Sequence, residues 1–348
     1  MIALRIVGGL LAALLFAGAI RRYSRRRISR LTLILMGLAM VGVVVLAIQP
    51  STFQPVFDLF RLRTGGGQRL IGVLIAADVV LFFLVFRGAS VADSAALSIR
   101  FLVEALALQA FDWATARGLA DGDTIVAVLP AHNEAENVGA VIHAMPDEVE
   151  GHRVVPVVVD DGSEDDTAGV ARRAGALVAR VPIRRGGGFA LRVGYEIGLR
   201  LNAAAVVSMD ADGQHVPDEM PLLVKPILED QADMVNGSRV LGEFERESVV
   251  RHVGVHFFSW LVTIITGSRI TDVSNGYRAT RTEVIKHLSL DQDQFWASEL
   301  LIEAMRMRLR IKEVPITIRA RAGGVSKKPK NVKYALNFAK AIMKTWLR

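Results

Sequence analysis

The alternation of short apolar runs with helical stretches between residues 123 and 209 constrains the fold most strongly. A strand, a helix and a further strand in this order form a parallel pair. The pattern therefore predicts an α/β domain with a mostly parallel, Rossmann-like sheet and helices on both faces. The predicted strands are 123–129, 154–159, 176–181 and 204–209, and the predicted helices are 133–144, 164–174 and 190–201.

Polar clusters follow three of these strands: PAHNEAEN after the first, DDGSEDDT after the second and DADGQH after the fourth. Ligands of such sheets bind beyond the carboxyl ends of the strands. We therefore expect the three clusters to form one site.

The first two clusters contain residues that can bind a nucleoside and residues that can cap the helices that follow. Asp160 and Asp161 offer hydrogen-bond acceptors to a base or a ribose, and Ser163 is predicted to cap the next helix. In the first cluster Asn133 or Glu134 is predicted to cap a helix and face the pocket. DDGS alone is equally consistent with a helix cap that has no further role.

The third cluster predicts a metal site. Asp210 and Asp212 lie one residue apart, so an extended backbone places them on one face. Two carboxylates suit a hard divalent cation such as Mg²⁺ or Mn²⁺, which can bridge two phosphates. The alternative is a solvated turn, because Asp-x-Asp is frequent by chance.

The first 90 residues predict a membrane domain. Hydrophobic residues make up 51% of the chain, although 22% of its residues are charged, and the apolar excess is concentrated here. Eighteen helical residues reach about 27 Å, close to the thickness of a bilayer core. We predict an all-α domain over 1–90 with three transmembrane helices at about 2–20, 31–48 and 70–86, the third of which contains Asp78.

The charges between the first two apolar runs predict the orientation. RRYSRRRISR at 21–30 carries six arginines, which the positive-inside rule places in the cytoplasm. These charges follow the first run, whereas a signal peptide has them before it. We therefore expect an integral protein of a bacterial plasma membrane with everything beyond Arg87 in the cytoplasm.

Two further amphipathic segments are predicted, of which the first lies on the membrane or leads into the soluble domain and the second lies on the membrane surface. Residues 91–120 form a predicted amphipathic linker helix, and residues 330–348 a basic amphipathic helix. The net charge of +7 indicates an anionic partner. Three membrane spans favour lipid over nucleic acid. Residues 247–267 fit either a lipid-facing helix or a core helix.

The chain has no cysteine, which excludes disulfides, thiolate metal sites and a cysteine nucleophile. The oligomeric state is left open by the sequence.

Taken together, the motifs resemble family 2 of the glycosyltransferases, and within it the dolichyl- or polyprenyl-phosphate sugar synthases. The resemblance covers about residues 122–329 and rests on PAHNEAEN, VVVDDGSEDDT, MDADGQHVPDEM, NGSR, TDVSNGYRA, SELLIEA and VPITIRARAGGVSK. It implies a GT-A fold over 121–329, a UDP- or GDP-sugar donor, a divalent metal and inversion at the anomeric carbon. The first 115 residues resemble a small membrane domain of unknown function.

Residue by residue, the resemblance implies three groups. The nucleoside would be held by Pro130, Asn133, Glu134, Asp160 and Asp161, and the metal and diphosphate by Asp210, Asp212 and Gln214. The acceptor phosphate would be clamped by Arg239, with Arg251 and Arg278 as partners.

The loop RRGGGFAL departs from the family pattern, in which asparagine precedes the glycines. Arg184 stands at the asparagine position, whereas Gly186 and Gly188 keep the close backbone approach expected near a ligand. The sugar and the nucleotide that this loop recognises are therefore left open.

The predicted reaction is transfer of a hexose to polyprenyl phosphate, whose anionic oxygen needs positioning more than a strong base. The alternative acceptor is a hydroxyl of a glycolipid or a cell-envelope glycan, for which Asp272 or Glu299 would be the base. Alternatively, Glu299 is a helix residue that forms a structural salt bridge and takes no part in the reaction. A non-catalytic nucleotide-sugar-binding scaffold is disfavoured by the intact Asp210 and Asp212 pair.

Overall fold

The computed structural model describes residues 67–120, 123–244, 249–320 and 332–347, together with 17–21 and a few positions between 23 and 41. The helices predicted at 2–20 and 31–48 fall mostly outside these residues. Among the residues described, no helix combines the length and the hydropathy needed to cross a bilayer.

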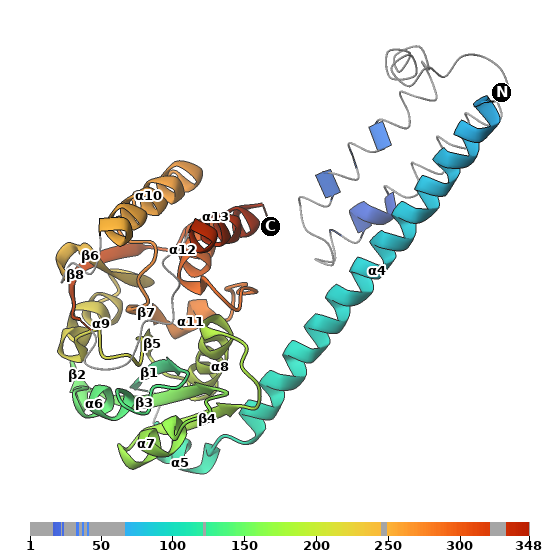
Figure 1. The fold of residues 1–348 in the computed structure, drawn as a ribbon. Helices are drawn as coiled ribbons and strands as arrows, with labels where there is room; N and C mark the ends of the chain where they lie inside the picture. Colours follow the sequence, from blue (N-terminus) through green and yellow to red (C-terminus); the bar gives the residue numbers. More distant parts are fainter. Residues whose placement is uncertain are drawn as a thin grey trace. The chain divides into compact units, whose positions relative to one another are not determined.

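The third predicted span and the predicted linker helix form one continuous helix, α4 (Gly67–Gln109) (Figure 1). The expected break between residues 86 and 91 is absent. Ser94 and Ser98 donate hydrogen bonds to the carbonyls four residues earlier, so these polar residues are satisfied within the helix and do not end it. A short helix, α5 (Trp113–Leu119), follows and is capped by Asp112, which accepts a hydrogen bond from the Thr115 amide.

The chain divides into two units, and the second, Phe101–Trp346, contains the sheet. In its described residues eight strands form one mixed sheet in the order β2-β3-β1-β5-β7-β6-β8, with β4 beside β3. β4, β3, β1 and β5 are parallel, as predicted, whereas β7 runs antiparallel to both β5 and β6. The strands are β1 (Thr124–Ala131), β2 (Glu148–Val149), β3 (His152–Asp161), β4 (Leu177–Val181), β5 (Ala205–Ser208), β6 (Met234–Phe244), β7 (Arg278–Arg281) and β8 (Ile311–Ile318).

Helices cover both faces of the sheet, because successive residues of each central strand point to opposite sides. In β1, Val126 and Val128 pack on one side with α8, whereas Ile125, Ala127 and Leu129 pack on the other. Each buried Val, Ile or Leu side chain among them stabilises the fold by roughly 1.5–3 kcal/mol. The helices are α6 (Val138–His143), α7 (Thr167–Arg173), α8 (Gly187–Arg200), α9 (Met220–Leu228), α10 (Val249–Thr266), α11 (Thr282–Ile285), α12 (Trp296–Arg306) and α13 (Val332–Trp346).

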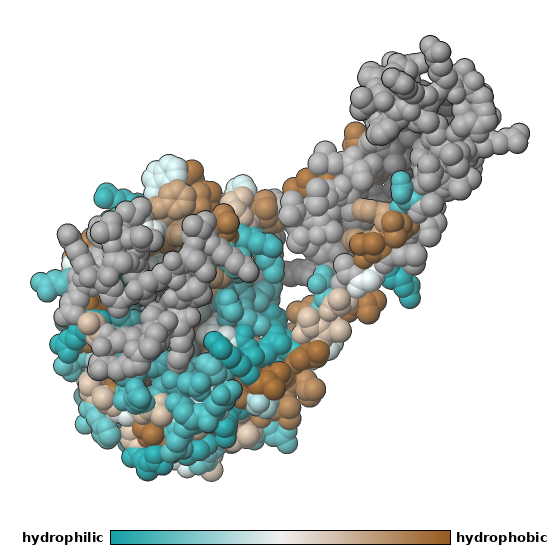
Figure 2. All heavy atoms as spheres, viewed as in Figure 1, coloured by the Kyte–Doolittle hydropathy of each residue, from teal (hydrophilic) through white to brown (hydrophobic). Residues whose placement is uncertain are grey.

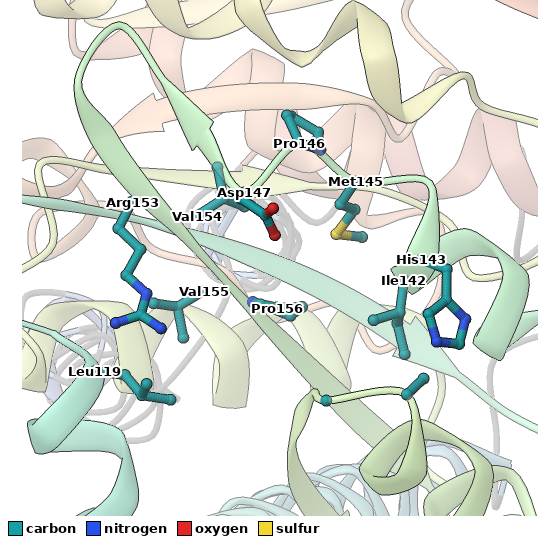
Figure 3. A pocket seen from close by; sticks show the side chains of 12 residues that line it. Leu119, Ile142, His143, Met145, Pro146, Asp147, Arg153, Val154, Val155 and Pro156 are labelled. Carbon is teal, nitrogen blue, oxygen red and sulfur yellow. The ribbon is translucent and has the colours of Figure 1, made fainter.

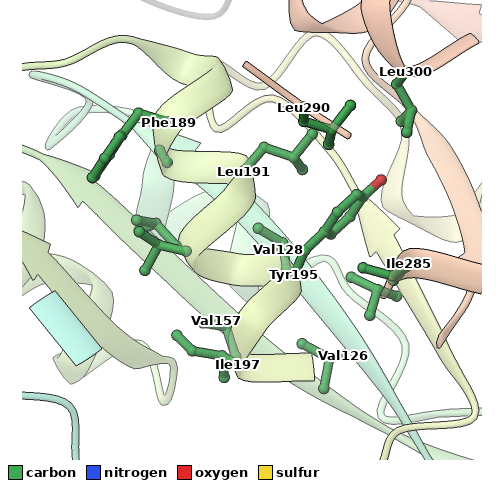
Figure 4. Close-up of a cluster of buried hydrophobic side chains, with 14 of the residues drawn as sticks. Val126, Val128, Val157, Phe189, Leu191, Tyr195, Ile197, Ile285, Leu290 and Leu300 are labelled. Carbon is green, nitrogen blue, oxygen red and sulfur yellow. The ribbon is translucent and has the colours of Figure 1, made fainter. Parts of the chain in front are cut away.

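The packing of α8 on the sheet is unusually close. A Cβ atom at Gly194 would lie 2.2 Å from a methyl group of Val128, and one at Gly198 would lie 2.4 Å from a methyl group of Val206. Figure 4 shows large side chains of α8, among them Leu191, Tyr195 and Ile197, together with Val126 and Val128 of β1 in the same apolar cluster. The helix is thereby held so that its first turn lies at the carboxyl edge of the parallel strands.

Candidate active site

The strand register places the three polar clusters at one edge of the sheet, as predicted. Ala131 at the end of β1 is level with Asp160 in β3, and Asp161 is level with Val181 at the end of β4. Ser208 of β5 is level with Val128, so Asp210, two residues further on, follows at the same edge.

The first two clusters are joined to each other by hydrogen bonds. Asn133 has a left-handed backbone with φ of 52°, and its Oδ1 accepts a hydrogen bond from the Glu164 amide at 2.8 Å. Its own amide donates to Ser163 Oγ at 2.9 Å, and the Glu134 amide donates to Thr167 Oγ1 at 2.9 Å. The two loops therefore form one rigid wall.

These contacts correct two predicted helix starts. The helix predicted from Asn133 begins at Val138, and the one predicted from Glu164 begins at Thr167. Ser163 does not cap α7, because its hydroxyl accepts from the neighbouring loop instead. The side chains of Asn133 and Ser163, which the local sequence predicted to cap helices, instead form hydrogen bonds between the two loops.

Asp160 and Asp161 have different surroundings. In Asp160, which is fully buried, Oδ1 accepts from the Ser163 amide. Its Oδ2 lies 3.3 Å from Nε of the exposed Arg180, which is ion-pair distance without hydrogen-bond geometry, and it accepts no hydrogen bond from the described residues. This oxygen is buried and faces the Arg180 guanidinium.

Asp161 instead holds the glycine-rich loop, residues 183–188. One carboxylate oxygen accepts from the Arg185 amide at 2.7 Å and the other from the Gly186 amide at 2.6 Å. Burial raises the pKa of Asp161, although these two amides act in the opposite direction. We therefore assign Asp161 to shaping the loop more than to contacting a base.

The glycines of this loop approach the chain itself. A Cβ atom at Gly186, where φ is 114°, would lie 2.4 Å from the Asp293 carbonyl oxygen. One at Gly188 would lie 2.2 Å from the Gln292 carbonyl oxygen. We expected a ligand to lie close to these glycines, but the backbone of residues 292–293 occupies that space instead.

In DADGQH the chain turns back sharply at Gly213, where φ is 75°. Asp212 is buried, with Oδ1 accepting from the Gln214 amide at 3.2 Å, and Asp210 is half-buried. The Gln214 side-chain amide donates to the Arg319 carbonyl at 3.2 Å, which ties this turn to the end of β8. Gln214 as a metal ligand stays a prediction.

Three further residues, His215, Asn275 and Trp296, support the carboxylate pair. His215 accepts the Asp210 amide at Nδ1 (3.2 Å), and its Nε2 lies 2.9 Å from Asn275 Oδ1. Because the Asn275 amide nitrogen donates to the Gly237 carbonyl, its oxygen accepts, and Nε2 is the protonated nitrogen. Trp296 also lies near the pair, since a Cβ atom at Gly276 would be 3.0 Å from Asp210 Oδ1 and 3.3 Å from the indole ring.

The donor set fits a hard divalent cation that is completed by substrate oxygens. In the described ranges no three His, Cys, Asp or Glu side chains are arranged to hold a metal by themselves. Mg²⁺ in nucleotide sites commonly takes one or two carboxylates and completes its shell with phosphate oxygens and water. Asp210 and Asp212 match that requirement.

Arg239 and Asp272 form a buried ion pair beside the site. Arg239 Nε lies 2.6 Å from Asp272 Oδ2, and Arg239 Nη2 also donates to Ser274 Oγ at 3.2 Å. The Asp272 side chain is fully buried, and 12% of the Arg239 side chain is exposed. Arg239 lies within β6.

Arg278 is placed differently from its predicted role. Its side chain is fully buried, with Nε donating to Asn236 Oδ1 at 2.7 Å, Nη2 to the Val273 carbonyl and Nη1 to the Ala297 carbonyl. A guanidinium whose three nitrogens are used inside the protein is not free to clamp a phosphate. We therefore assign Arg278 to the support of β6, β7 and α12.

Glu313, which the sequence did not point to, connects the Asn236 side chain that Arg278 contacts with the segment that contains Asp272. Its carboxylate accepts from the Asn236 side chain at 2.9 Å and from the Thr271 amide at 2.8 Å. Glu299 accepts two backbone amides, those of Asp291 and Gln292, and its predicted salt bridge stays a prediction. The side chain of Arg251, in α10, lies outside the description, so its role stays a prediction.

A cavity of about 390 Å³ lies at the other end of β3 (Figure 3). It is lined by the start of β3 and the ends of α6 and α7, with Arg153, His143 and Asp147 at its polar positions. Because Asp160 and Asp161 lie at the opposite end of that strand, we do not assign this cavity to the site.

Curated relatives match the part of the chain that contains this site. The polyprenol monophosphomannose synthase of Mycolicibacterium smegmatis is 34% identical over 216 residues, covering 58% of this chain and 79% of that protein. The undecaprenyl-phosphate mannosyltransferase of Micrococcus luteus is 30% identical over 214 residues, covering 58% and 86%. The UDP-N-acetylglucosamine–dolichyl-phosphate N-acetylglucosaminyltransferase of Methanococcus voltae is 29% identical over 218 residues, covering 55% and 84%.

Solved structures and a family profile agree with these relatives. Glucosyl-3-phosphoglycerate synthase from Mycobacterium tuberculosis, crystallised with Mn²⁺, UDP and glucosyl-3-phosphoglycerate, matches with a TM-score of 0.52 and 25% identity, covering 67% of this chain and 81% of that one. The profile described as glycosyl transferase family 2 matches residues 126–289, which include both aspartate clusters and the Arg239–Asp272 pair. With this mixed α/β sheet and these relatives, the chain belongs to glycosyl transferase family 2.

Proposed function

We propose that this chain is a metal-dependent, inverting hexosyltransferase that moves a sugar from a nucleotide donor to polyprenyl phosphate at the cytoplasmic face of a bacterial plasma membrane. The observation that carries the proposal is the meeting of Asp210 and Asp212 with the ends of β1 and β3 at one edge of the sheet. The relatives named above act, by their names, on polyprenol, dolichyl or undecaprenyl phosphate.

The donor nucleoside is assigned to the wall formed by the first two polar clusters. Asp160 Oδ2 is buried and accepts no hydrogen bond from the described residues, so it would become an acceptor for the N–H groups of a uracil or a guanine when the exposed Arg180 side chain moves aside. Asn133 and Ser163 hold the wall in place. Both UDP- and GDP-sugars fit this chemistry.

The diphosphate and its metal are assigned to Asp210 and Asp212, with Gln214 as a predicted further ligand. When bound, Mg²⁺ or Mn²⁺ would supply Lewis-acid neutralisation of the leaving diphosphate. The hydrogen bond from the Gln214 amide to Asp212 and that from the Asp210 amide to His215 fix the turn that presents the two carboxylates. The protein thus positions these charges before the substrate arrives.

The acceptor phosphate is assigned to Arg239. Asp272 accepts hydrogen bonds from Arg239 and from Ser274, so it orients the guanidinium. This use of its oxygens replaces the predicted role of Asp272 as a base. A phosphate monoester is anionic at neutral pH and needs in-line positioning more than proton removal. Because Asp272 is occupied as a hydrogen-bond acceptor and a phosphate acceptor needs no strong base, the arrangement favours lipid phosphate over a hydroxyl acceptor.

Membrane contact is proposed on the basis of two amphipathic helices. On α10, Phe257, Trp260 and Ile264 are 51%, 58% and 58% exposed and recur on one face. On α13, Leu336 is 65% exposed, and the side chain of Lys340 is exposed four residues further on. Figure 2 shows apolar side chains gathered over α10. The exposed apolar face of α10 favours a lipid surface, and the lysines of α13 favour one that is anionic.

The acceptor assignment is tested with Arg239→Ala and Arg239→Lys. We expect the KM for polyprenyl phosphate to rise about tenfold or more with Arg239→Lys, because an ammonium cannot reproduce the planar fork. Arg239→Ala is expected to weaken acceptor use further and also to lower stability, since it leaves Asp272 buried and unpaired. Release of UDP or GDP is measured with and without polyprenyl phosphate.

The matched control is Arg310→Ala, which removes an exposed arginine from its pairs with Asp230 and Asp233. Its acceptor KM should stay within about twofold of wild type, since exposed pairs contribute little. Nucleotide release from wild-type protein that does not depend on polyprenyl phosphate would contradict the proposed function. A rise in donor KM alone in Arg239→Lys would assign Arg239 to the donor.

A further inference from the structure

The segment between α11 and α12, Asp291–Phe295, is shaped from inside the protein by Glu299. Glu299 is fully buried, and its two carboxylate oxygens accept the amides of Asp291 and Gln292, each at 2.9 Å. A carboxylate held by two amides fixes the backbone direction of the segment. We call Asp291–Phe295 the bridge segment.

One side of the bridge segment contacts the C-terminal helix α13. Gln292 Nε2 donates to the Ala341 carbonyl at 2.8 Å and to the hydroxyl of Thr345, which is 1% exposed. The ring of Phe295 lies 5.3 Å from the ring of Phe338 in an edge-to-face arrangement. Gln292 is therefore bonded to α13 through two buried acceptors.

The other side of the bridge segment contacts the glycine-rich loop. The Asp293 carbonyl accepts the Gly188 amide at 2.9 Å, and its carboxylate pairs with Arg185 at 2.9 Å and with Arg192. The Gln292 carbonyl accepts from Arg192 Nη1 at 3.1 Å. Arg185 is also the residue whose amide bonds Asp161 at the nucleoside wall.

These contacts form a continuous path from α13 to the nucleoside wall. It runs from Thr345 through Gln292 and Asp293 to Arg185, and from there to Asp161. The part of the glycine-rich loop that precedes α8, residues 183–186, has no regular secondary structure. Ordering such a loop on ligand binding costs conformational free energy, and prior ordering improves affinity.

We propose that Gln292 and Asp293 are positioning residues that couple the docking of α13 to the binding of the donor nucleoside diphosphate. The inference rests on the proposed function, because it takes the glycine-rich loop to border the donor. It goes beyond that function in making α13 part of the donor site and not only a membrane-surface helix.

The sharpest variant is Gln292→Glu, which keeps the shape of the side chain but removes the N–H groups that reach Ala341 and Thr345. We expect its dissociation constants for UDP or GDP with Mn²⁺ to rise about five- to tenfold, and its rate at saturating donor to stay within about twofold of wild type. Thr345→Val should give a smaller rise in the same direction, whereas Thr345→Ser, which keeps the hydroxyl, should bind like wild type.

Gln294→Glu is the matched control, since it makes the same change two residues away on an exposed side chain. Nucleotide binding is measured by titration calorimetry on the full chain in detergent, and thermal melting is recorded in parallel. Equal nucleotide affinities in wild type and Gln292→Glu would overturn the coupling, whatever the melting temperatures. So would a fall in the saturated rate with unchanged donor KM. If wild-type protein binds neither nucleotide, the proposed function itself fails, which distinguishes the two failures.

Discussion

Asp212→Asn is expected to lower the rate of sugar transfer by about 10²–10³-fold while leaving the fold intact, because loss of one of two metal-facing charges removes several kcal/mol of charge stabilisation. Asparagine retains a side-chain oxygen that can accept the Gln214 amide, so the turn should keep its shape. The change therefore isolates the charge. Initial transfer rates with Mn²⁺ and a far-UV circular dichroism spectrum measure the two expectations.

The control for this variant is Asp218→Asn, which makes the same substitution on an exposed side chain a few residues further on. We expect it to transfer at the wild-type rate. Full activity in Asp212→Asn would count against the metal role of this residue, and so would wild-type activity that a chelator does not diminish.

Arg278→Met is expected to lower the free energy of unfolding by about 3–5 kcal/mol, the largest stability effect that we predict. Methionine fills much of the same space but leaves the Asn236 side-chain oxygen and the carbonyls of Val273 and Ala297 without these donors. Burial lowers the pKa of Arg278 to about 10, so the guanidinium is still protonated at neutral pH. Denaturant unfolding of the full chain in detergent measures the loss.

Arg281→Met, three residues along the same strand, is the matched control. Arg281 is 23% exposed, pairs with the 73% exposed Asp230 and donates to the carbonyls of Ile227 and Ala232, so we expect a smaller loss of about 1–2 kcal/mol. If Arg278→Met were as stable as wild type and had lost only acceptor binding, Arg278 would be a phosphate ligand after all, as the family resemblance first implied.

The sequence predicted the parallel half of the sheet because its signals there are local. Each of β1, β3, β4 and β5 is a short apolar run, and three of them end directly before a polar cluster. Parallel strands then bring such ends together, so the convergence of Asp160 and Asp210 follows from chain order alone.

The other half of the sheet was not predicted, because its strands carry polar residues that are satisfied only by distant partners. Asn236 and Ser238 lie in β6 and are fully buried, yet their hydrogen bonds reach Glu313, Thr271 and Asp272. No local pattern distinguishes such residues from an exposed turn. The same network explains the buried position of Arg278, which motif comparison alone assigned to the ligand.

The glycine-rich loop illustrates a second limit. Glycine at positions 186 and 188 indicates a close approach, but the sequence does not say whether a ligand or the chain itself approaches. Here residues 292–293, about a hundred positions further on, fill that space. The helix predicted from Asn133 was too long for a related reason, since the Asn133 side chain bonds to the next loop.

The central claim is tested most directly by supplying the purified full chain in detergent with Mn²⁺, polyprenyl phosphate and radiolabelled UDP- or GDP-sugars, and measuring the label that partitions into the organic phase. The account predicts label in the lipid with one class of donor, its loss on adding a chelator, and its loss in Asp212→Asn. Label that stays in the aqueous phase with every donor, while a glycolipid or glycan extract triggers release of the nucleotide, would contradict the polyprenyl-phosphate acceptor.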